Sequence, residues 1–340
     1  MIIKEEIYIR KVIVHICDQA VGMAVLSDTE LDVREEMSEF LREHIARLAG
    51  GDDCKKCHFY EKESELYARL LEYADDEFIP LSKDIANGLY EIMIHNVEIP
   101  SADLFVVRFK CRDDEYLAIL KMDYREFYTH RTMSGEGGNN NEIIKYKSIL
   151  PGKTQRISEG AVINLKDFEI SLTEKKYEIN GKKENYFSYL FLKCSAHMSP
   201  KSTLSVVTKA IESVQKEAFD EEHQYEEHMK AKNIISQVLE EEGSFQVEAI
   251  AAKVFEDAPN LVVPFEEKME KYNLVKEVVK PQAETTIRKF DKQCLITDTG
   301  IEIKIPMEQY RDPGAVEFIT NADGTVSVFI KNIGRLTAKF

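Results

Sequence analysis

The sequence lacks the features of a membrane-spanning or exported protein. No apolar run approaches the roughly 20 residues needed to cross a bilayer. The first residues, 1–6, end in an acidic pair and contain no apolar core, so we expect no export signal. Six cysteines in 340 residues are too few for a disulfide scaffold. We therefore expect free thiols, a reducing cytoplasm and no membrane contact.

Positive charge is also scarce. The chain has 45 basic and 61 acidic residues, a net charge of −16, which excludes a uniformly basic coat for nucleic acid. Only residues 151–215 are net positive, at +3, and residues 281–340 are neutral. Residues 1–150 carry −11 and residues 216–280 carry −8. A polyanion would bind first in the central or C-terminal window, although +3 is also an ordinary fluctuation.

The apolar pattern predicts an α+β fold with a mixed N-terminal portion, a helical middle and a β-rich end. Predicted strands cover 6–17, 21–26, 102–110, 115–124, 143–149, 161–165 and 169–179. Predicted helices cover 27–48 and 62–74, start at Pro80 and Pro200, and recur around 229–241, 245–256 and 265–273. The pattern predicts a polar loop at residues 134–141, a hairpin turn at Asn180-Gly181, and short strands over 284–332. We expect three parts: a mixed domain 1–198, a helical segment 199–280 and a small β-rich region 281–340.

One cysteine cluster has the spacing of a metal site. Cys54 and Cys57 are separated by two residues and are followed by His58, so the three could share one tetrahedral ion. A structural zinc needs four ligands, and the remaining cysteines are scattered. The alternative is a solvent-facing loop with free thiols, and we therefore assign no metal and no cofactor.

A catalytic interpretation rests on one weak pattern. Asp298, Glu302 and Lys304 would place two carboxylates and an ammonium together, an arrangement that can hold Mg²⁺ in a nuclease. Any half-exposed strand shows the same alternation of polar and apolar residues. No Gly-x-Ser-x-Gly elbow and no acid–base pair stands out, so we do not expect an enzyme.

The central basic residues are the candidates for nucleic-acid contact. The basic candidates are Lys145, Lys147, Lys153, Arg156, Lys175, Lys176, Lys182, Lys183, Lys193, Lys201 and Lys209. The hairpin at 180–181 would project Lys182 and Lys183 toward a groove or along phosphates. Two alternatives stay open: Glu178 would face Lys183 across the hairpin and neutralise part of its charge, and lysines on sheet edges also discourage aggregation.

Three stretches together resemble one protein family. They are Ile149–Leu165 (ILPGKTQRISEGAVINL), Tyr186–Cys194 (YFSYLFLKC) leading into Ser199–Ser202 (SPKS), and Val316–Ile333 (VEFITNADGTVSVFIKNI). The strand Val12–His15 and the helix start Ser64-Glu-Leu are also similar. In order and spacing they resemble the bacterial nucleoid-associated protein family, the thirty-seven-kilodalton class, over nearly the whole chain.

The resemblance implies a cytoplasmic protein that associates with the nucleoid and helps to organise the chromosome without catalysis. Our leading hypothesis is DNA binding with little sequence preference through phosphate contacts. The residues predicted to make them are Lys147, Lys153, Arg156, Lys182, Lys183, Lys193 and Lys201. One alternative is a protein–protein interaction module that a partner recruits to the nucleoid, with the acidic helices of 216–280 as its surface. The other is the Mg²⁺-dependent nuclease. A homodimer would bring two modest positive patches side by side.

Overall fold

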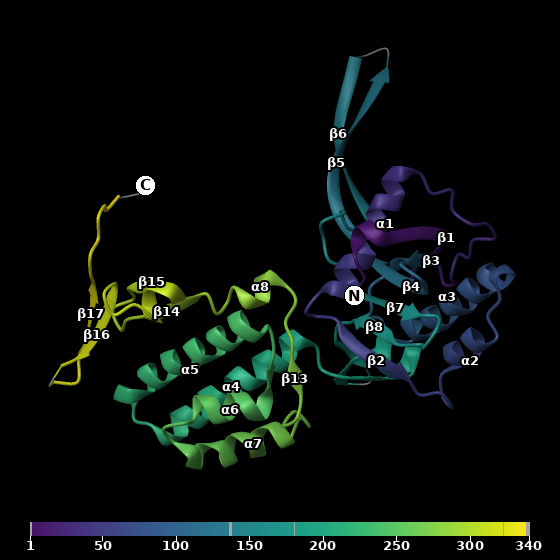
Figure 1. The fold of residues 1–340 in the computed structure, drawn as a ribbon. Coiled ribbons are helices and arrows are strands. Elements are labelled where there is room, and N and C mark those ends of the chain that lie inside the picture. The colour runs from purple at the N-terminus through teal and green to yellow at the C-terminus, as the bar shows by residue number, and fades with distance from the viewer. Residues whose placement is uncertain (1, 136–137, 180, 322, 338–340) are drawn as a thin grey trace. The chain divides into compact units, whose positions relative to one another are not determined.

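The computed structural model describes residues 2–135, 138–179, 181–321 and 323–337. The chain forms two compact units, Met1–Ser199 and Pro200–Phe340. Helices and strands are both abundant and the large sheet is antiparallel, which confirms the α+β prediction (Figure 1).

A seven-stranded antiparallel sheet forms the centre of the first unit. Its strands, in spatial order, are β1 (Ile7–Cys17), β3 (Ala102–Cys111), β4 (Asp114–Asp123), β7 (Glu159–Asn164), β8 (Ile170–Thr173), β2 (Lys55–Phe59) and β11 (Cys194–Ala196). The predicted strand 6–17 and the predicted hairpin 102–124 are confirmed. A smaller hairpin, β9 (Tyr177–Ile179) with β10 (Lys182–Glu184), follows β8.

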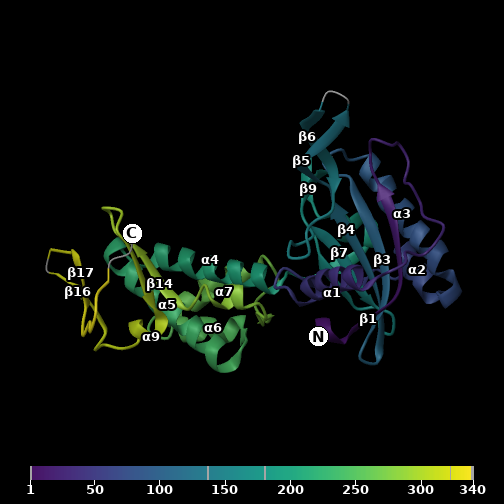
Figure 2. The same ribbon diagram turned by 90° about the horizontal axis from the view of Figure 1, so that it is seen from above.

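Both faces of this sheet are covered by helices. Helix α1 (Glu35–Gly50) packs on one face, and α2 (Glu65–Leu71), α3 (Phe78–Ile94) and the π-helix η3 (Phe187–Leu192) pack on the other (Figure 2). Alternate residues of β3 enter the two cores: Leu104 contributes to the α3 side and Phe105 to the α1 side. The central strands are therefore almost continuously apolar.

Glycine at position 160 allows α1 to approach the sheet closely. A Cβ on Gly160 would lie 2.7 Å from Cδ1 of Leu48 and 2.9 Å from the carbonyl oxygen of Ile119. No side chain fits there without moving the helix or the neighbouring strand. The close contact fixes α1 over β7, beside the segment that enters β7 from β6.

A long two-stranded arm interrupts the sheet between β4 and β7. Strands β5 (Arg125–Gly135) and β6 (Gly138–Ile149) pair with each other only and project beyond the sheet (Figure 1). The predicted polar loop at 134–141 is wrong where the structure describes it, because 138–141 and 134–135 are strand. We call residues 125–149 the arm.

The second unit is largely helical. Its helices are α4 (Pro200–Ala218), α5 (Glu221–Glu242), α6 (Val247–Val254), α7 (Val262–Glu270), α8 (Glu284–Ile287) and α9 (Met307–Tyr310). Its hairpins pair β12 (Phe245–Gln246) with β13 (Val278–Val279), β14 (Lys292–Ile296) with β15 (Glu302–Pro306), and β16 (Val316–Thr320) with β17 (Val326–Ile330). Leu204, Val207, Ile211 and Val214 of α4 are buried on one face, as the predicted helix from Pro200 requires.

Three local predictions are wrong. The first long helix begins at Glu35 rather than at Ser27, because Ser27 instead donates its hydroxyl to the Val14 carbonyl. The predicted strand 21–26 is reduced to a single bridge between Ile16 and Val25. Residues 284–287 form a short helix rather than a strand. Asn180 of the predicted hairpin turn lies outside the described residues, but Ile179 and Lys182 on either side are paired as a two-residue turn requires.

Candidate nucleic-acid interface

Strand register gathers several separate segments at one end of the sheet. Strand β4 ends where β7 begins, with Lys121 paired to Glu159, and the arm connects the two. Strand β8 ends at the same place, because Thr173 pairs with Gly160, so the β9–β10 hairpin also starts there. We call this the arm end of the sheet. It comprises the arm, the connection 150–158 and the segment 173–184.

Five of the seven predicted contact residues belong to the arm end. Lys147 is on β6, Lys153 and Arg156 are in the connection to β7, and Lys182 and Lys183 are on β10. They come from three stretches of sequence that only the strand register joins.

The other two predicted residues lie elsewhere. Lys193 precedes β11, whose first residue, Cys194, pairs with the last residue of β2, Phe59. Because β2 starts at the arm end, Lys193 lies at the opposite end. Lys201 belongs to α4 of the second unit.

The predicted cations differ in their ion pairs. Lys153 Nζ lies 3.0 Å from a Glu39 carboxylate oxygen, and Arg156 lies 2.5 Å from Asp53. Lys193 pairs with Glu65 at 3.2 Å. Such exposed pairs are each worth about 0–1 kcal/mol, so a phosphate can compete for the cation. Among the described residues, Lys147, Lys182 and Lys183 have no carboxylate within 4.0 Å.

The arm carries further basic side chains beside the predicted contact residue Lys147, among them the sequence candidate Lys145. Arg125, Arg131 and Lys145 add to Lys147, and residues 125–158 hold six basic and three acidic side chains, a net charge of +3. Arg131 pairs with Glu142 at 2.5 Å, and Lys145 pairs with Glu126. Arg125 is exposed, without a carboxylate in reach in the described part of the chain. The whole molecule carries −16, so this local excess stands out.

Aromatic and apolar side chains alternate with these cations on both faces of the arm. Phe127 and Tyr146 are cross-strand partners, 46% and 53% exposed. Tyr128 is 72% exposed and lies opposite Lys145, whose ammonium is 6.0 Å from the centre of the tyrosine ring. A two-stranded ribbon with both faces in water is only marginally stable alone. Exposed rings beside cations are the chemistry that stacks on bases and neutralises phosphates.

A buried ionic network supports the root of the arm. Lys121, whose side chain is fully buried, lies 2.9 Å from Glu159 and also pairs with Asp123, two residues before the arm. The Tyr186 hydroxyl donates a hydrogen bond of 2.7 Å to Glu159. Burial raises the pKa of Glu159, and Lys121 opposes that rise. Removing one partner would leave a buried charge uncompensated, so the network holds the ends of β4 and β7 in place.

The cysteine cluster does not form a metal site in the described residues. Cys54 immediately precedes β2 and Cys57 lies on it, and both are buried, so the expected solvent-facing loop is wrong. Strand alternation points Cys57 into the core and leaves His58 exposed on the other face. Burial raises the pKa of the Cys54 thiol to about 11, and contact with Cys194 together with burial also raises that of Cys57. The described residues contain no group of three or more side chains able to hold a metal.

The nuclease candidates are likewise not assembled. Glu302 and Lys304 are exposed neighbours on β15 that form an ion pair of 2.8 Å. This pair lowers the pKa of Glu302 and raises that of Lys304. A side-chain oxygen of Asp298 accepts a hydrogen bond from the backbone N–H of Thr299 in the preceding turn. The three residues therefore form a salt-bridged strand and a turn.

Comparison with known proteins identifies the family of the chain. No helix in the described part of the chain is long and apolar enough to cross a bilayer. The chain is an α+β protein with a projecting two-stranded ribbon that carries basic and aromatic side chains. Residues 13–336 match the family described as nucleoid-associated protein YejK. The chain belongs to this family of nucleoid-associated proteins, which confirms the resemblance seen in the sequence. A search of curated proteins gave no match.

Proposed function

We propose that this nucleoid-associated protein binds duplex DNA directly, with little sequence preference, through phosphate contacts made by the arm end. The observation that carries the proposal is that five cations from three separate stretches of sequence lie at one end of one unit. Arg125 and Lys145 of the arm extend the same surface. Membership of a nucleoid-associated family supports this function.

The shape and chemistry of the arm explain why contact would be sequence-tolerant. A two-stranded ribbon is narrow enough to enter the major groove of B-DNA or to follow a strand. A bidentate contact between asparagine and adenine uses both the side-chain oxygen and the side-chain amine. The side-chain oxygens of Asn141 and Asn139 near the tip already accept hydrogen bonds from Thr132 and Ser134. Lysines instead contact phosphates, which carry no sequence information.

The acidic remainder of the molecule is compatible with this function. Net negative charge repels DNA from other surfaces and leaves the arm end as the favourable approach. We propose that the protein acts in the cytoplasm in organising the chromosome, and the proposal assigns it no catalytic step. A homodimer would present two arm ends to one duplex and raise avidity.

Salt dependence and charge reversal test the proposal. About five phosphate contacts predict that log K falls with log salt at a slope of about −4 to −5. Lys147→Glu should weaken binding about tenfold on two unrelated duplex sequences alike and reduce the slope by about 1 to 2. The double change Lys182→Glu with Lys183→Glu should weaken binding further. Fluorescence anisotropy with labelled duplexes measures both quantities.

Lys166→Glu is the matched control. Lys166 lies in the connection from β7 to β8, at the end of the sheet opposite the arm, and is 80% exposed. Lys166→Glu changes the net charge by the same amount as Lys147→Glu but lies away from the arm end, so it should change the affinity for DNA by no more than about twofold. Equal losses for Lys147→Glu and Lys166→Glu would mean that total charge matters and the arm end does not. Affinity that ignores salt would refute the phosphate mechanism.

A further inference from the structure

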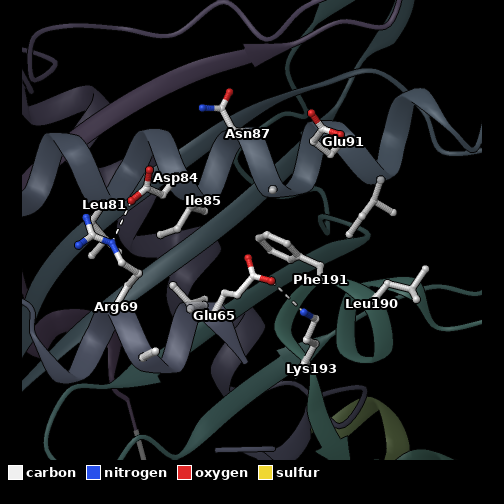
Figure 3. A pocket seen from close by; sticks show the side chains of 14 residues that line it. Glu65, Arg69, Leu81, Asp84, Ile85, Asn87, Glu91, Leu190, Phe191 and Lys193 are labelled. Carbon is white, nitrogen blue, oxygen red and sulfur yellow. Dashed lines mark hydrogen bonds and ion pairs between the residues drawn. The ribbon is translucent and has the colours of Figure 1, made fainter. Parts of the chain in front are cut away.

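A groove of about 710 Å³ is lined by the helices α2, α3 and η3 of the first unit (Figure 3). Helix α2 contributes Glu65, Leu66, Ala68 and Arg69, and α3 contributes residues between Leu81 and Ile92. The π-helix η3 and the residue after it contribute Leu190, Phe191 and Lys193. None of these elements belongs to the arm end, so the DNA proposal does not use this surface.

The groove has an apolar lining, and it is open because small residues occupy positions where larger side chains would fill it. Its apolar lining consists of Leu66, Leu81, Ile85, Ile92, Leu190 and Phe191, and Ala68 and Gly88 add no bulk. Gly88 is exposed on α3, and a Cβ there would lie 4.0 Å from the Phe191 ring, an ordinary contact. Glycine inside a helix costs about 0.5–1 kcal/mol relative to alanine, and no steric demand for it exists at this position. The space it leaves is therefore available to a ligand.

The length of the groove matches that of a short helix. The residues of α3 that line it run from Leu81 to Ile92, which spans about 16 Å at 1.5 Å per residue. About three turns of a second helix occupy that length. An amphipathic helix in such a groove anchors itself with apolar side chains at positions i, i+3 or i+4, and i+7.

The charge around the groove determines the character of the occupant. The lining carries three acidic and two basic side chains, and residues 61–98, which include both α2 and α3, carry a net charge of −7. Two basic groups at the groove are already engaged: Arg69 pairs with Asp84 at 3.0 Å and Lys193 with Glu65 at 3.2 Å (Figure 3). Glu91 is exposed on the rim. DNA and acidic peptides are repelled here, whereas lysine and arginine are attracted.

We propose that this groove binds an amphipathic helix of a partner protein, with an apolar stripe flanked by lysine and arginine. The stripe fills the space beside Gly88, and the basic flanks face Glu91 on the rim. The protein then has two separate binding surfaces of opposite character: a basic arm end for DNA and an acidic, apolar-floored groove for a basic partner helix.

Selection from a phage-displayed library of random 14-residue peptides on the full-length protein tests this proposal. The expected peptides carry apolar residues at helical spacing with lysine or arginine beside them. A synthetic peptide of the winning sequence should bind Gly88→Leu at least about tenfold more weakly, because the leucine occupies the groove. Gly88→Ala is the matched control: it adds one methyl to the same helix position and should retain affinity within about threefold. Both substitutions raise helix propensity, so the variants are expected to fold.

Charge is tested with the same peptide. Glu91→Lys should weaken its binding, and a version with glutamate flanks should bind the unaltered protein at least about tenfold more weakly. The proposal would be overturned if the selected peptides are acidic or lack the helical pattern. It would also be overturned if selection on the unaltered protein enriches no peptides relative to selection on the Gly88→Leu protein.

Discussion

At the scale of single residues, two histidines are buried without charge. The Ser27 backbone N–H donates to Nδ1 of His15 at 3.1 Å, and Nε2 of His15 lies 3.0 Å from the Ser82 hydroxyl. His44 packs edge-on against Phe40, and its Nε2 has no hydrogen-bond partner in the described structure. Burial lowers the pKa of each histidine from 6.5 to about 4. Both side chains are therefore neutral in the folded protein at neutral pH.

These lowered pKa values predict destabilisation in mild acid. The unfolded chain takes up protons near pH 6.5, before the folded protein does, so this contribution is intact above pH 6.5 and is lost as the pH falls toward 4. For each histidine, the free energy of unfolding should fall by about 2 kcal/mol between pH 7 and pH 5. His44→Leu removes one titrating group, and the pH dependence of urea unfolding should shrink by about that amount. An unchanged pH dependence would show that His44 is protonated in the fold.

At the scale of secondary-structure elements, a helix or strand is predictable from the sequence where one of its faces is buried. Strands β1, β3 and β4 and helix α3 are predictable because their apolar residues follow the period of the element that buries them. The arm is not predictable in this way. Its 125–135 strand exposes both faces, so polar and apolar residues need not alternate, and the run of Gly and Asn at 137–141 is typical of a loop.

The candidate interface was only partly predictable for a related reason. Lys147, Lys182 and Lys183 are recognisable as exposed cations from their sequence surroundings. Their common location depends on Lys121 pairing with Glu159 and Thr173 pairing with Gly160, and no local pattern encodes that register. The same lack of long-range information put Lys193 in the predicted set although β11 places it at the other end of the sheet.

The arm should be removable without unfolding the unit that carries it. Neither hydrophobic core contains a residue between 125 and 149. Arg125 and Ile149 are cross-strand partners, so replacing residues 126–148 with Asn-Gly closes the connection with a two-residue turn and removes Lys147 together with the exposed rings of the arm. We expect the melting temperature to change by no more than about 4 °C and duplex affinity to fall at least about tenfold. Unchanged affinity in the shortened protein would exclude Lys147 and the arm from the DNA interface.

At the scale of the whole molecule, charge of opposite sign is kept in separate stretches. Residues 125–158 carry +3, residues 61–98 carry −7 and residues 216–280 carry −8. A molecule with a uniform charge of −16 would be repelled by DNA from every direction, whereas this distribution leaves one attractive approach. The acidity and the proposed DNA binding are therefore compatible.

The division into two units predicts that DNA binding belongs to the first. Residues 1–199 contain both sheet cores, the buried Lys121 network and the complete arm end. We expect this fragment to unfold cooperatively and to bind duplex DNA within about threefold of the full chain, with the same salt slope, because the same phosphate contacts form. The fragment 200–340 serves as the control. Fluorescence anisotropy titrations of each fragment against the same labelled duplex compare their affinities. Binding by 200–340 alone would contradict the assignment, since Lys201 is the only predicted contact residue it contains.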